Sequence, residues 1–373
     1  MNSLPVNILY TIPNFITAGS GQAMLNVIHR LDRARFAPSI CVLKSGGRLE
    51  ATILEMGIPF YELPFTVAPR PLYRLPGHLW QMARKFRPFH FSLWHSYHYL
   101  DDYTEPLIAY ASGARAWVYT KKNMGWGSRA WKIRTLLAAR VAATNSAMLE
   151  RFFTAPRTRQ KVRLIPTGVD SELFQPGIPP RLGLRQRLGL GQETLMVGCV
   201  ANLIPIKGHP TLIRAVARVP NAALLLAGKP LDQTYVDGLR ELCASLQVQD
   251  RVYFLDDVRD IPAFDAELDI FVLPSISRGE GGSVALLEAM ACGVACIATD
   301  VPGSQDMIEQ GVSGLLVPPE QDQPMAQAIR ALTATPDLRA QMGKAARARV
   351  VEKYSLEGEA RALETLYTEL LRL

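Results

Sequence analysis

Short apolar runs alternate with longer amphipathic stretches along the second half of the chain. The runs are residues 195–200, 222–227, 252–255, 269–274, 294–298 and 314–317. Between them, apolar residues recur at helical spacing over 208–219, 234–247 and 283–292. Continuous apolar strands with intervening helices indicate a parallel sheet that helices cover on both faces. Ligands of such sheets bind at the carboxyl ends of the strands.

The first half shows the same alternation less regularly. Its apolar runs are residues 6–10, 39–43, 91–94, 117–120 and 141–144. After the first run, Gly19-Ser20-Gly21 predicts a glycine loop that leads into a helix over about 22–31.

Prolines 166, 176, 179 and 180 crowd the middle of the chain and predict a linker at 168–180. We therefore predict two doubly wound, Rossmann-like α/β domains facing a cleft, residues 1–170 and 171–355. The terminal segment 356–373 repeats leucines on one helical face, so we expect this helix to pack back on the first domain.

Composition narrows the class of protein. Of 373 residues, 48% are hydrophobic and 20% charged, which is typical of a globular chain with a sizeable core. No apolar run approaches the ~18 residues of a membrane-spanning helix, and the first residues lack a secretory signal, so we expect a cytoplasmic protein. The five cysteines are scattered without a CxxC pair, which argues against disulfides and a zinc site.

Charge is distributed unevenly along the chain. Residues 1–170 carry 22 lysines and arginines against nine acids, a net charge of +13, whereas 171–373 carry 19 against 25, a net charge of −6. The basic half favours an anionic partner such as a membrane, a nucleic acid or a phosphorylated substrate. A solvated surface with chance asymmetry is the alternative.

Residues 121–163 concentrate this basic character and interleave it with Trp126, Trp131, Phe152 and Phe153. The composition fits docking on the anionic inner face of the plasma membrane. It also fits core helices with a solvated basic face, and no recognised module supports nucleic-acid binding.

The strongest candidate for chemistry is the glycine-rich stretch 275–293. Gly281 and Gly282 follow an apolar run and precede a predicted helix, with Ser283 in place to cap it. Free N–H groups in the first turn, through Val284, favour a phosphate. Two carboxylates, Glu280 and Glu288, flank this turn and could hold hydroxyl-rich groups on either side of it.

This stretch resembles the signature of the large retaining glycosyltransferase family called glycosyl transferases group 1. That signature is a glutamate, seven residues, a second glutamate, then Ala-Met-Ala and a glycine, which Glu280, Glu288 and residues 289–293 match. The resemblance implies a B-type fold of two Rossmann-like domains and a nucleotide-diphosphate sugar, UDP- or GDP-linked, used without a metal or other cofactor. It also implies that Glu280 contacts sugar hydroxyls and Glu288 the nucleotide ribose.

Three further segments resemble family elements in the expected order: 164–170, 200–209 and 299–306, the last with Pro302 and Asp306 as departures. By this resemblance Lys207 neutralises the leaving diphosphate. The family usually has an arginine where this chain has Asn202; Arg278 compensates, or the variant is ordinary in a subfamily.

Two first-half features complete the predicted site. Gly19 and Gly21 resemble the family's amino-terminal glycine loop near the donor phosphate. They fail as a dinucleotide fingerprint because the third glycine position is Met24, which disfavours hydride transfer. The family often has a histidine at a strand end near the reacting sugar, and His95 and His98 are both candidates.

The resemblance therefore implies a retaining glycosyltransferase that moves a sugar to a glycan or lipid-linked acceptor, with cell-envelope polysaccharide or lipopolysaccharide as the expected product. In this family the acceptor is described as attacking the sugar on the same face that the nucleotide leaves, and no side chain of the protein acts as the nucleophile. Two alternatives stay open: a hydrolysing nucleotide-sugar epimerase and a non-catalytic nucleotide-sugar-binding subunit.

Overall fold

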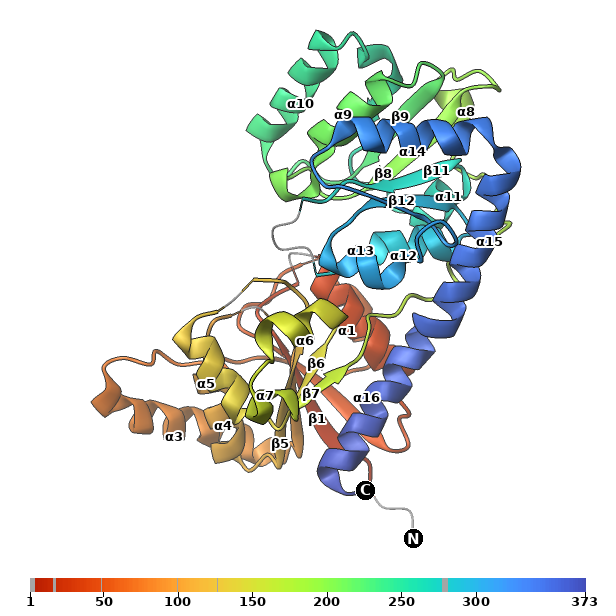
Figure 1. Cartoon of the computed structure of the whole chain (residues 1–373). Coiled ribbons are helices and arrows are strands. Elements are labelled where there is room, and N and C mark those ends of the chain that lie inside the picture. The colour runs from red at the N-terminus through yellow and green to blue at the C-terminus, as the bar shows by residue number, and fades with distance from the viewer. Residues whose placement is uncertain (1–3, 16–17, 48, 99, 126, 277–280) are drawn as a thin grey trace. The chain divides into compact units, whose positions relative to one another are not determined.

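The chain folds into two compact units, shown by a computed structural model that describes residues 4–15, 18–47, 49–98, 100–125, 127–276 and 281–373 (Figure 1). Unit 1 comprises residues 1–167 and 356–373, and unit 2 comprises residues 168–355. Each unit contains one parallel sheet with helices on both faces. The predicted class of two doubly wound α/β domains is confirmed.

Unit 1 is built on a seven-stranded sheet of order β3-β2-β1-β4-β5-β6-β7. Its strands are β1 (Val6–Ile12), β2 (Phe36–Val42), β3 (Phe60–Glu62), β4 (Leu93–Ser96), β5 (Ala116–Lys121), β6 (Arg140–Ala143) and β7 (Val162–Leu164). All described pairings are parallel, and the register places Thr11 of β1 opposite Ser96 of β4. Side chains of alternate residues therefore feed two cores, one on each face.

Helices cover both faces of this sheet. One core joins the sheet to α1, α2 and the carboxyl-terminal helix α16, and the other joins it to α3, α4, α5 and α6. The helical elements of unit 1 are α1 (Ala18–Arg30), α2 (Glu50–Glu55), η1 (Leu72–Arg74), α3 (Leu75–Phe86), η2 (Arg87–Phe89), α4 (Thr104–Ser112), α5 (Arg129–Leu137), α6 (Ser146–Phe152), α7 (Pro156–Arg159) and α16 (Leu356–Leu371).

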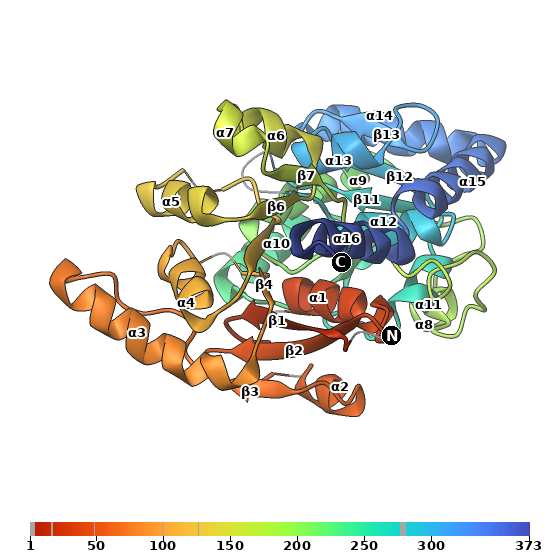
Figure 2. The same ribbon diagram turned by 90° about the horizontal axis from the view of Figure 1, so that it is seen from below.

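The carboxyl-terminal helix α16 is part of unit 1, although the whole of unit 2 precedes it in the chain. It lies beside α1 (Figure 2), and Leu363 and Leu366 are buried in the core they share. The hydroxyl of Tyr367 lies 3.0 Å from that of Tyr10 on β1. Burial of each such leucine contributes about 1.5–3 kcal/mol, so α16 is an integral part of the unit 1 core.

Unit 2 has a six-stranded parallel sheet of order β10-β9-β8-β11-β12-β13. Its strands are β8 (Leu195–Val200), β9 (Ala222–Ala227), β10 (Val252–Phe254), β11 (Ile270–Leu273), β12 (Ala295–Thr299) and β13 (Leu315–Val317). Helices α9, α10 and α14 share one core with the sheet, and α12 and α15 share another. The helical elements are α8 (Leu184–Arg187), η3 (Pro205–Lys207), α9 (His209–Ala217), α10 (Gln233–Ser245), η4 (Gln249–Arg251), α11 (Ile261–Ala266), α12 (Val284–Ala291), α13 (Pro302–Met307), α14 (Asp322–Ala334) and α15 (Pro336–Lys353).

Two features of unit 1 differ from the sequence prediction. The short edge strands β3 and β7 were not predicted, because each includes a charged residue, Glu62 or Arg163, that interrupts the apolar run. The predicted glycine loop at 19–21 is wrong: α1 begins at Ala18, so Gly19 and Gly21 lie in its first turn.

Candidate functional site

The strand order of unit 2 has a topological switch point between β8 and β11. Strand β8 has β9 on one side and β11 on the other, so the connections that leave β8 and β11 run to opposite sides. Ligands of doubly wound sheets bind at the carboxyl ends of the strands at such a switch point. Three of the four segments that carry the family resemblance follow β8, β11 and β12 and therefore meet at this edge.

Close backbone contacts hold the first two segments together. The N–H of Ile276, after β11, donates to the carbonyl of Ile206, after β8, at 3.0 Å. Gly208 has a φ of +68°, and a Cβ there would lie 2.0 Å from the carbonyl oxygen of Pro274. Only glycine fits this position, so the backbone that carries Lys207 is pinned against the segment after β11.

The third segment, which follows β12, lies in close contact with the backbone of the glycine-rich turn. A Cβ on Gly303 in α13 would lie 2.4 Å from both the nitrogen and the Cα of Gly282. Thr299, at the end of β12, donates its hydroxyl to the carbonyl of Ser275 at 2.5 Å. The backbone of the turn is thus fixed from the side of β12.

Helix α12 begins directly after the turn. Ser283 occupies the predicted N-cap position before Val284, but its side chain accepts no hydrogen bond from the helix. Ser283 therefore leaves the first N–H groups of α12 without a side-chain partner of its own, and these groups and the helix dipole suit an anion.

Glu288 lies one and a half turns further along α12. Burial raises its pKa to about 7. A second carboxyl group lies nearby: Asp265 of α11, the helix that packs against α12, is fully buried, and among the described residues neither of its oxygens has a hydrogen-bond partner. Burial, and then the charge of Glu288, raise the pKa of Asp265 well above its usual range. Sequence reasoning missed Asp265, because nothing in the sequence marks it as buried.

We expect Asp265→Asn to raise the melting temperature of the protein at pH 8. The unfolded carboxyl ionises near pH 4, whereas the folded one keeps its proton to a higher pH, so native stability falls as pH rises above 4. Asparagine cannot ionise and removes this loss. Thermal unfolding between pH 4 and 8 should show a gain of a few degrees at pH 8 that shrinks toward pH 4. Asp237→Asn, at an exposed side chain of α10, is the control. A lower melting temperature of Asp265→Asn at pH 8 would contradict this assignment.

Of the remaining predicted residues of unit 2, the structure describes Asn202 and Lys207. Asn202 is exposed immediately after β8, and Lys207 is half-buried at the end of η3. Leu203, which follows Asn202, donates its N–H to the carbonyl of Lys229 after β9. Arg278 and Glu280 lie outside the described residues, so the compensation of Asn202 by Arg278 stays a prediction.

Unit 1 has its own switch point, between β1 and β4. Gly19 lies at the start of α1, after β1, and a Cβ there would meet no atom within 4 Å. Gly21 differs, because a Cβ would lie 2.7 Å from the Phe15 ring. Gly21 is therefore required for packing, whereas nothing in the fold requires Gly19.

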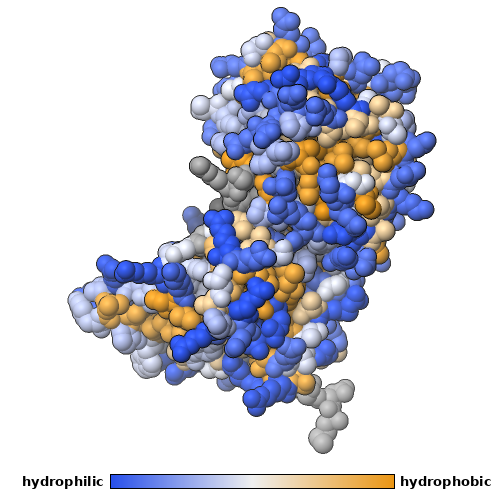
Figure 3. All heavy atoms as spheres, viewed as in Figure 1, coloured by the Kyte–Doolittle hydropathy of each residue, from blue (hydrophilic) through white to orange (hydrophobic). Residues whose placement is uncertain are grey.

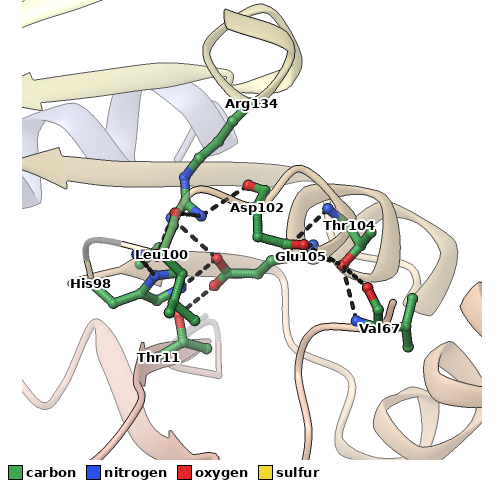
Figure 4. A network of polar contacts seen from close by, with 9 residues as sticks. Thr11, Val67, His98, Leu100, Asp102, Thr104, Glu105 and Arg134 are labelled. Carbon is green, nitrogen blue, oxygen red and sulfur yellow. Dashed lines mark hydrogen bonds and ion pairs between the residues drawn. The ribbon is translucent and has the colours of Figure 1, made fainter. Parts of the chain in front are cut away.

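A buried polar network occupies the same edge (Figure 4). Nε2 of His98, after β4, lies 2.8 Å from Oε2 of Glu105 on α4, and Thr11 of β1 donates its hydroxyl to Oε1 of Glu105 at 2.5 Å. Arg134 of α5 lies 3.2 Å from Oε2 of the same carboxylate. Arg134 also donates to Ser96 at 2.6 Å. Sequence reasoning missed Glu105, Arg134 and Thr11, because no motif joins positions so far apart.

The network fixes the protonation of His98. The N–H of Leu100 donates to Nδ1 at 3.1 Å, so the ring proton is on Nε2 and is donated to Glu105. Burial lowers the pKa of His98, in agreement with a neutral ring. For Glu105, burial alone would raise the pKa, but His98 and Arg134 outweigh it and lower the pKa to about 2. Glu105 is thus a paired carboxylate that holds the segment after β4.

His95 lies three residues before His98, within β4 itself. Its Nδ1 is 2.5 Å from the hydroxyl of Tyr367 and its Nε2 is 2.8 Å from that of Thr120. Burial lowers the pKa of His95 to about 3. Core hydroxyls occupy both ring nitrogens of His95, and both ring nitrogens of the buried His98 also have partners, so the choice between the two histidines stays open.

The described aromatic side chains of the basic stretch 121–163 lie wholly or partly inside the fold, and the contact of this stretch with a membrane stays a prediction. Lys121, Trp131, Arg134 and Phe153 are buried, and Phe152 is partly buried. Trp126 lies outside the described residues. This burial favours the alternative of core helices with a solvated basic face over the part of the stretch that the structure describes.

The described residues contain neither a candidate metal site nor a candidate membrane-spanning helix. No group of three or more histidine, cysteine, aspartate or glutamate side chains could hold a metal ion there. Within the same ranges, no helix is both long and apolar enough to span a membrane.

Comparison with protein families matches both halves of the chain. Residues 182–349 match the family model described as Glycosyl transferases group 1, and residues 17–173 match the one described as Glycosyltransferase Family 4. The segments after β8, β11 and β12 all lie within the first match.

Curated relatives share part of the chain. A GDP-mannose-dependent alpha-(1-6)-phosphatidylinositol monomannoside mannosyltransferase of Mycolicibacterium smegmatis is 33% identical over 208 residues, 53% of each chain. The chain thus spans about half the length of the first curated relatives it matches. The lipopolysaccharide core biosynthesis mannosyltransferase LpsB of Rhizobium meliloti is 28% identical over 68% of this chain and 70% of its own.

Solved structures resemble the whole chain. A glycosyltransferase from Rickettsia africae superposes with a TM-score of 0.87 at 20% identity, over 98% of this chain and 99% of its own. HepE of Anabaena, in complex with UDP and glucose, superposes with a TM-score of 0.82 at 21% identity, over 97% and 99%. At these identities the likeness shows the fold.

Proposed function

We propose, from the premise that this chain belongs to the group 1 glycosyltransferases, that it transfers a sugar from a nucleoside-diphosphate sugar to a glycan or lipid-linked acceptor of the cell envelope. The observation that carries the proposal is the meeting of three pinned backbone segments at the switch point of unit 2. These segments carry Lys207, the amino end of α12 and Glu288, which supports a donor site at this edge of the sheet. The names of two relatives give a phosphatidylinositol mannoside and the lipopolysaccharide core as what they act on or help to make, which supports this acceptor class.

Each group has a role in this proposal. The N–H groups after Gly282 and the ammonium of Lys207 receive the diphosphate and stabilise the charge that builds on it as the sugar leaves. Glu288 accepts hydrogen bonds from the nucleotide ribose, and Glu280 from the sugar. Gly19 leaves room at the start of α1 for the phosphate or the acceptor, and the neutral His98 lies at the matching edge of unit 1.

The chemistry we propose is positional and electrostatic. A bound donor and acceptor held in reactive geometry need charge stabilisation more than a protein nucleophile. By family resemblance we extend the proposal to retention of the anomeric configuration, to independence from metal ions and to action at the cytoplasmic face of the membrane. Proton NMR of the product tests retention, and turnover in excess EDTA tests the metal.

A thermal-shift screen over UDP-, GDP- and ADP-sugars tests the donor class. A ligand at one hundred times its Kd stabilises the native state by about 2.7 kcal/mol, so the true donor should raise the melting temperature by several degrees. A flat response to all three nucleotides would contradict the proposal. Nucleotide release that needs no acceptor would indicate the epimerase, and binding without any turnover would indicate a non-catalytic subunit.

Nucleotide binding should strengthen as pH rises from 6 to 8. Glu288 has a raised pKa of about 7, and only its carboxylate form accepts two hydrogen bonds from the ribose. Each unit of pH below that pKa should weaken binding up to about tenfold. Titration calorimetry with the donor nucleotide measures this, and Glu288→Gln should bind weakly with a flat pH profile. Should the wild-type affinity be equally flat, Glu288 does not hold the ribose.

A further inference from the structure

Helix α15 directs three arginines toward backbone carbonyl groups of unit 2. Its outer face is exposed, and Figure 3 shows hydrophilic atoms along the right-hand edge of unit 2, where Figure 1 places this helix. The three arginines are only partly exposed, and each donates hydrogen bonds to carbonyl oxygens of other segments. They are Arg339, Arg347 and Arg349. Because such bonds are charge-assisted, each arginine holds the backbone to which it donates.

Arg349 donates to the end of α13. Its Nε lies 2.7 Å from the carbonyl oxygen of Met307, and a second guanidinium nitrogen lies 2.9 Å from that of Asp306. Tyr354, which follows α15 and is buried, donates its hydroxyl to the same Asp306 carbonyl at 2.5 Å. The carboxylate of Glu309, 3.4 Å from Arg349, is exposed and contributes little. The last carbonyl groups of a helix have no donor within it, so α15 supplies donors to α13 from outside.

Helix α13 also contacts the glycine-rich turn. The backbone of Gly303 lies against that of Gly282, and a Cβ on Gly282 would lie 3.1 Å from the terminal methyl group of Met307. Met307 is buried and shares a core with α12 and Tyr354. The same short helix therefore contacts the turn and receives the donors of α15. Asp306 accepts these bonds at its backbone carbonyl, so the departure of its side chain from the family pattern does not affect them.

We propose that Arg349 and Tyr354 are positioning residues of the donor site, which fix α13 and, through it, the turn at Gly282. The proposal rests on the proposed function, which assigns this turn to the diphosphate. Backbone N–H groups stabilise the charge on a leaving group most strongly when they are already in place. Neither Arg349 nor Tyr354 needs to touch the donor to have this effect.

Both donors act over the whole physiological pH range. Arginine stays charged, and burial raises the pKa of Tyr354, so its hydroxyl keeps its proton. The contribution of these two residues to nucleotide affinity should therefore be the same at pH 6 and at pH 8. This distinguishes it from the contribution of Glu288, which should fall as pH is lowered.

Replacement of Arg349 by methionine is expected to weaken nucleotide binding by about tenfold to a hundredfold, because a displacement of about 1 Å in a positioning element has effects of that order. Titration calorimetry with the nucleotide identified by the thermal-shift screen measures the Kd at a temperature at which the variant is fully folded. Arg349→Lys should recover part of the affinity, since an ammonium group still donates to one carbonyl. Tyr354→Phe removes one hydroxyl and should weaken binding about threefold.

Arg339→Met is the matched control. Arg339 belongs to the same helix, and its side chain is 20% exposed against 18% for Arg349. It also donates to two backbone carbonyls, those of Leu332 and Thr333, but these lie in α14. Loss of Arg339 should lower the melting temperature about as much as loss of Arg349 and leave the nucleotide Kd unchanged. A merely structural role of Arg349 would give the same result as this control.

Hydrogen exchange of the protein without nucleotide tests the hold on the turn directly. The N–H of Ile308 donates to Ser304 at the end of α13, and that of Leu287 donates to Ser283 at the start of α12. Peptides that contain these two amides should exchange about tenfold faster in Arg349→Met than in the wild type. Arg339→Met should leave both peptides unchanged. Tyr354→Phe provides the same comparison should Arg349→Met not fold.

Three results would overturn the proposal. The first is a wild-type nucleotide Kd in Arg349→Met, and the second is an equal loss of affinity in Arg339→Met. The third is faster exchange in α13 without any change at the start of α12. A wild-type protein that binds none of the UDP-, GDP- and ADP-sugars would instead refute the proposed function, and hydrogen exchange alone would then decide whether Arg349 holds the turn.

Discussion

Replacement of Lys207 by alanine is expected to lower the rate of sugar transfer by about a hundred- to a thousandfold. The lysine lies on a backbone that Gly208 and Ile276 fix against the segment after β11. Its ammonium would therefore already be in place when negative charge builds on the departing diphosphate, and the loss of one preorganised charge-stabilising group has effects of this size. Steady-state kinetics with the donor identified by the thermal-shift screen measure the change.

Two further variants separate this role from a general effect of charge. Lys207→Arg should recover part of the rate, because the positive charge is kept while its position changes. Lys344→Ala removes an exposed lysine of α15 in the same unit and should transfer sugar like the wild type. If Lys207→Ala retained more than a tenth of the wild-type rate, the lysine would not stabilise the leaving group.

Replacement of Gly303 by alanine is expected to weaken nucleotide binding and transfer by about a hundredfold while both units stay folded. The new methyl group would lie 2.4 Å from the nitrogen of Gly282, so the turn before α12 must move. A shift of about 1 Å in a positioning element can cost that much in rate. Nucleotide titration and kinetics on the same protein sample measure both effects.

Gly238→Ala is the matched control for this change. Gly238 lies within α10, and a Cβ there would meet no atom within 4 Å. Alanine at this helical position should raise stability by up to about 1 kcal/mol and leave binding unchanged. Normal nucleotide affinity of Gly303→Ala would show that the backbone of the turn does not contact the diphosphate.

The sequence predicted the fold where the burial pattern is strong. Every predicted apolar run coincides with a strand of one of the two sheets, because a strand covered on both faces is apolar throughout. The same principle fails for β3 and β7, edge strands in which Glu62 and Arg163 interrupt the apolar run. It also fails at Gly19, where two glycines suggested a loop although α1 already begins at Ala18.

The candidate site was predictable where residues lie close together in the sequence. Lys207 and Glu288 sit in local motifs that follow β8 and β11, and the sheet order alone brings these strand ends together. Asp265 and Glu105 could not be found in this way. Asp265 acquires its raised pKa from burial between helices, and Glu105 acquires its partners from β1, β4 and α5.

Hydrogen-bond partners distinguish residues that sequence alone treats as equal. His95 and His98 lie three positions apart in the same motif, and both are buried. In the fold, His95 is bonded to two core hydroxyls, whereas His98 is bonded to a carboxylate and to a backbone N–H. In the same way, Trp131 and Phe153 of the stretch 121–163 lie in the core, whereas Ile133 and Leu136 of the same stretch are exposed.

The central claim is that the switch point of unit 2 holds the diphosphate of an activated sugar. A crystal structure with the donor bound tests it most directly. The account predicts phosphate oxygens within hydrogen-bond distance of the N–H groups at the start of α12 and of Nζ of Lys207, with the ribose on Glu288. A diphosphate bound elsewhere on the chain, with this turn filled by side chains, would contradict it.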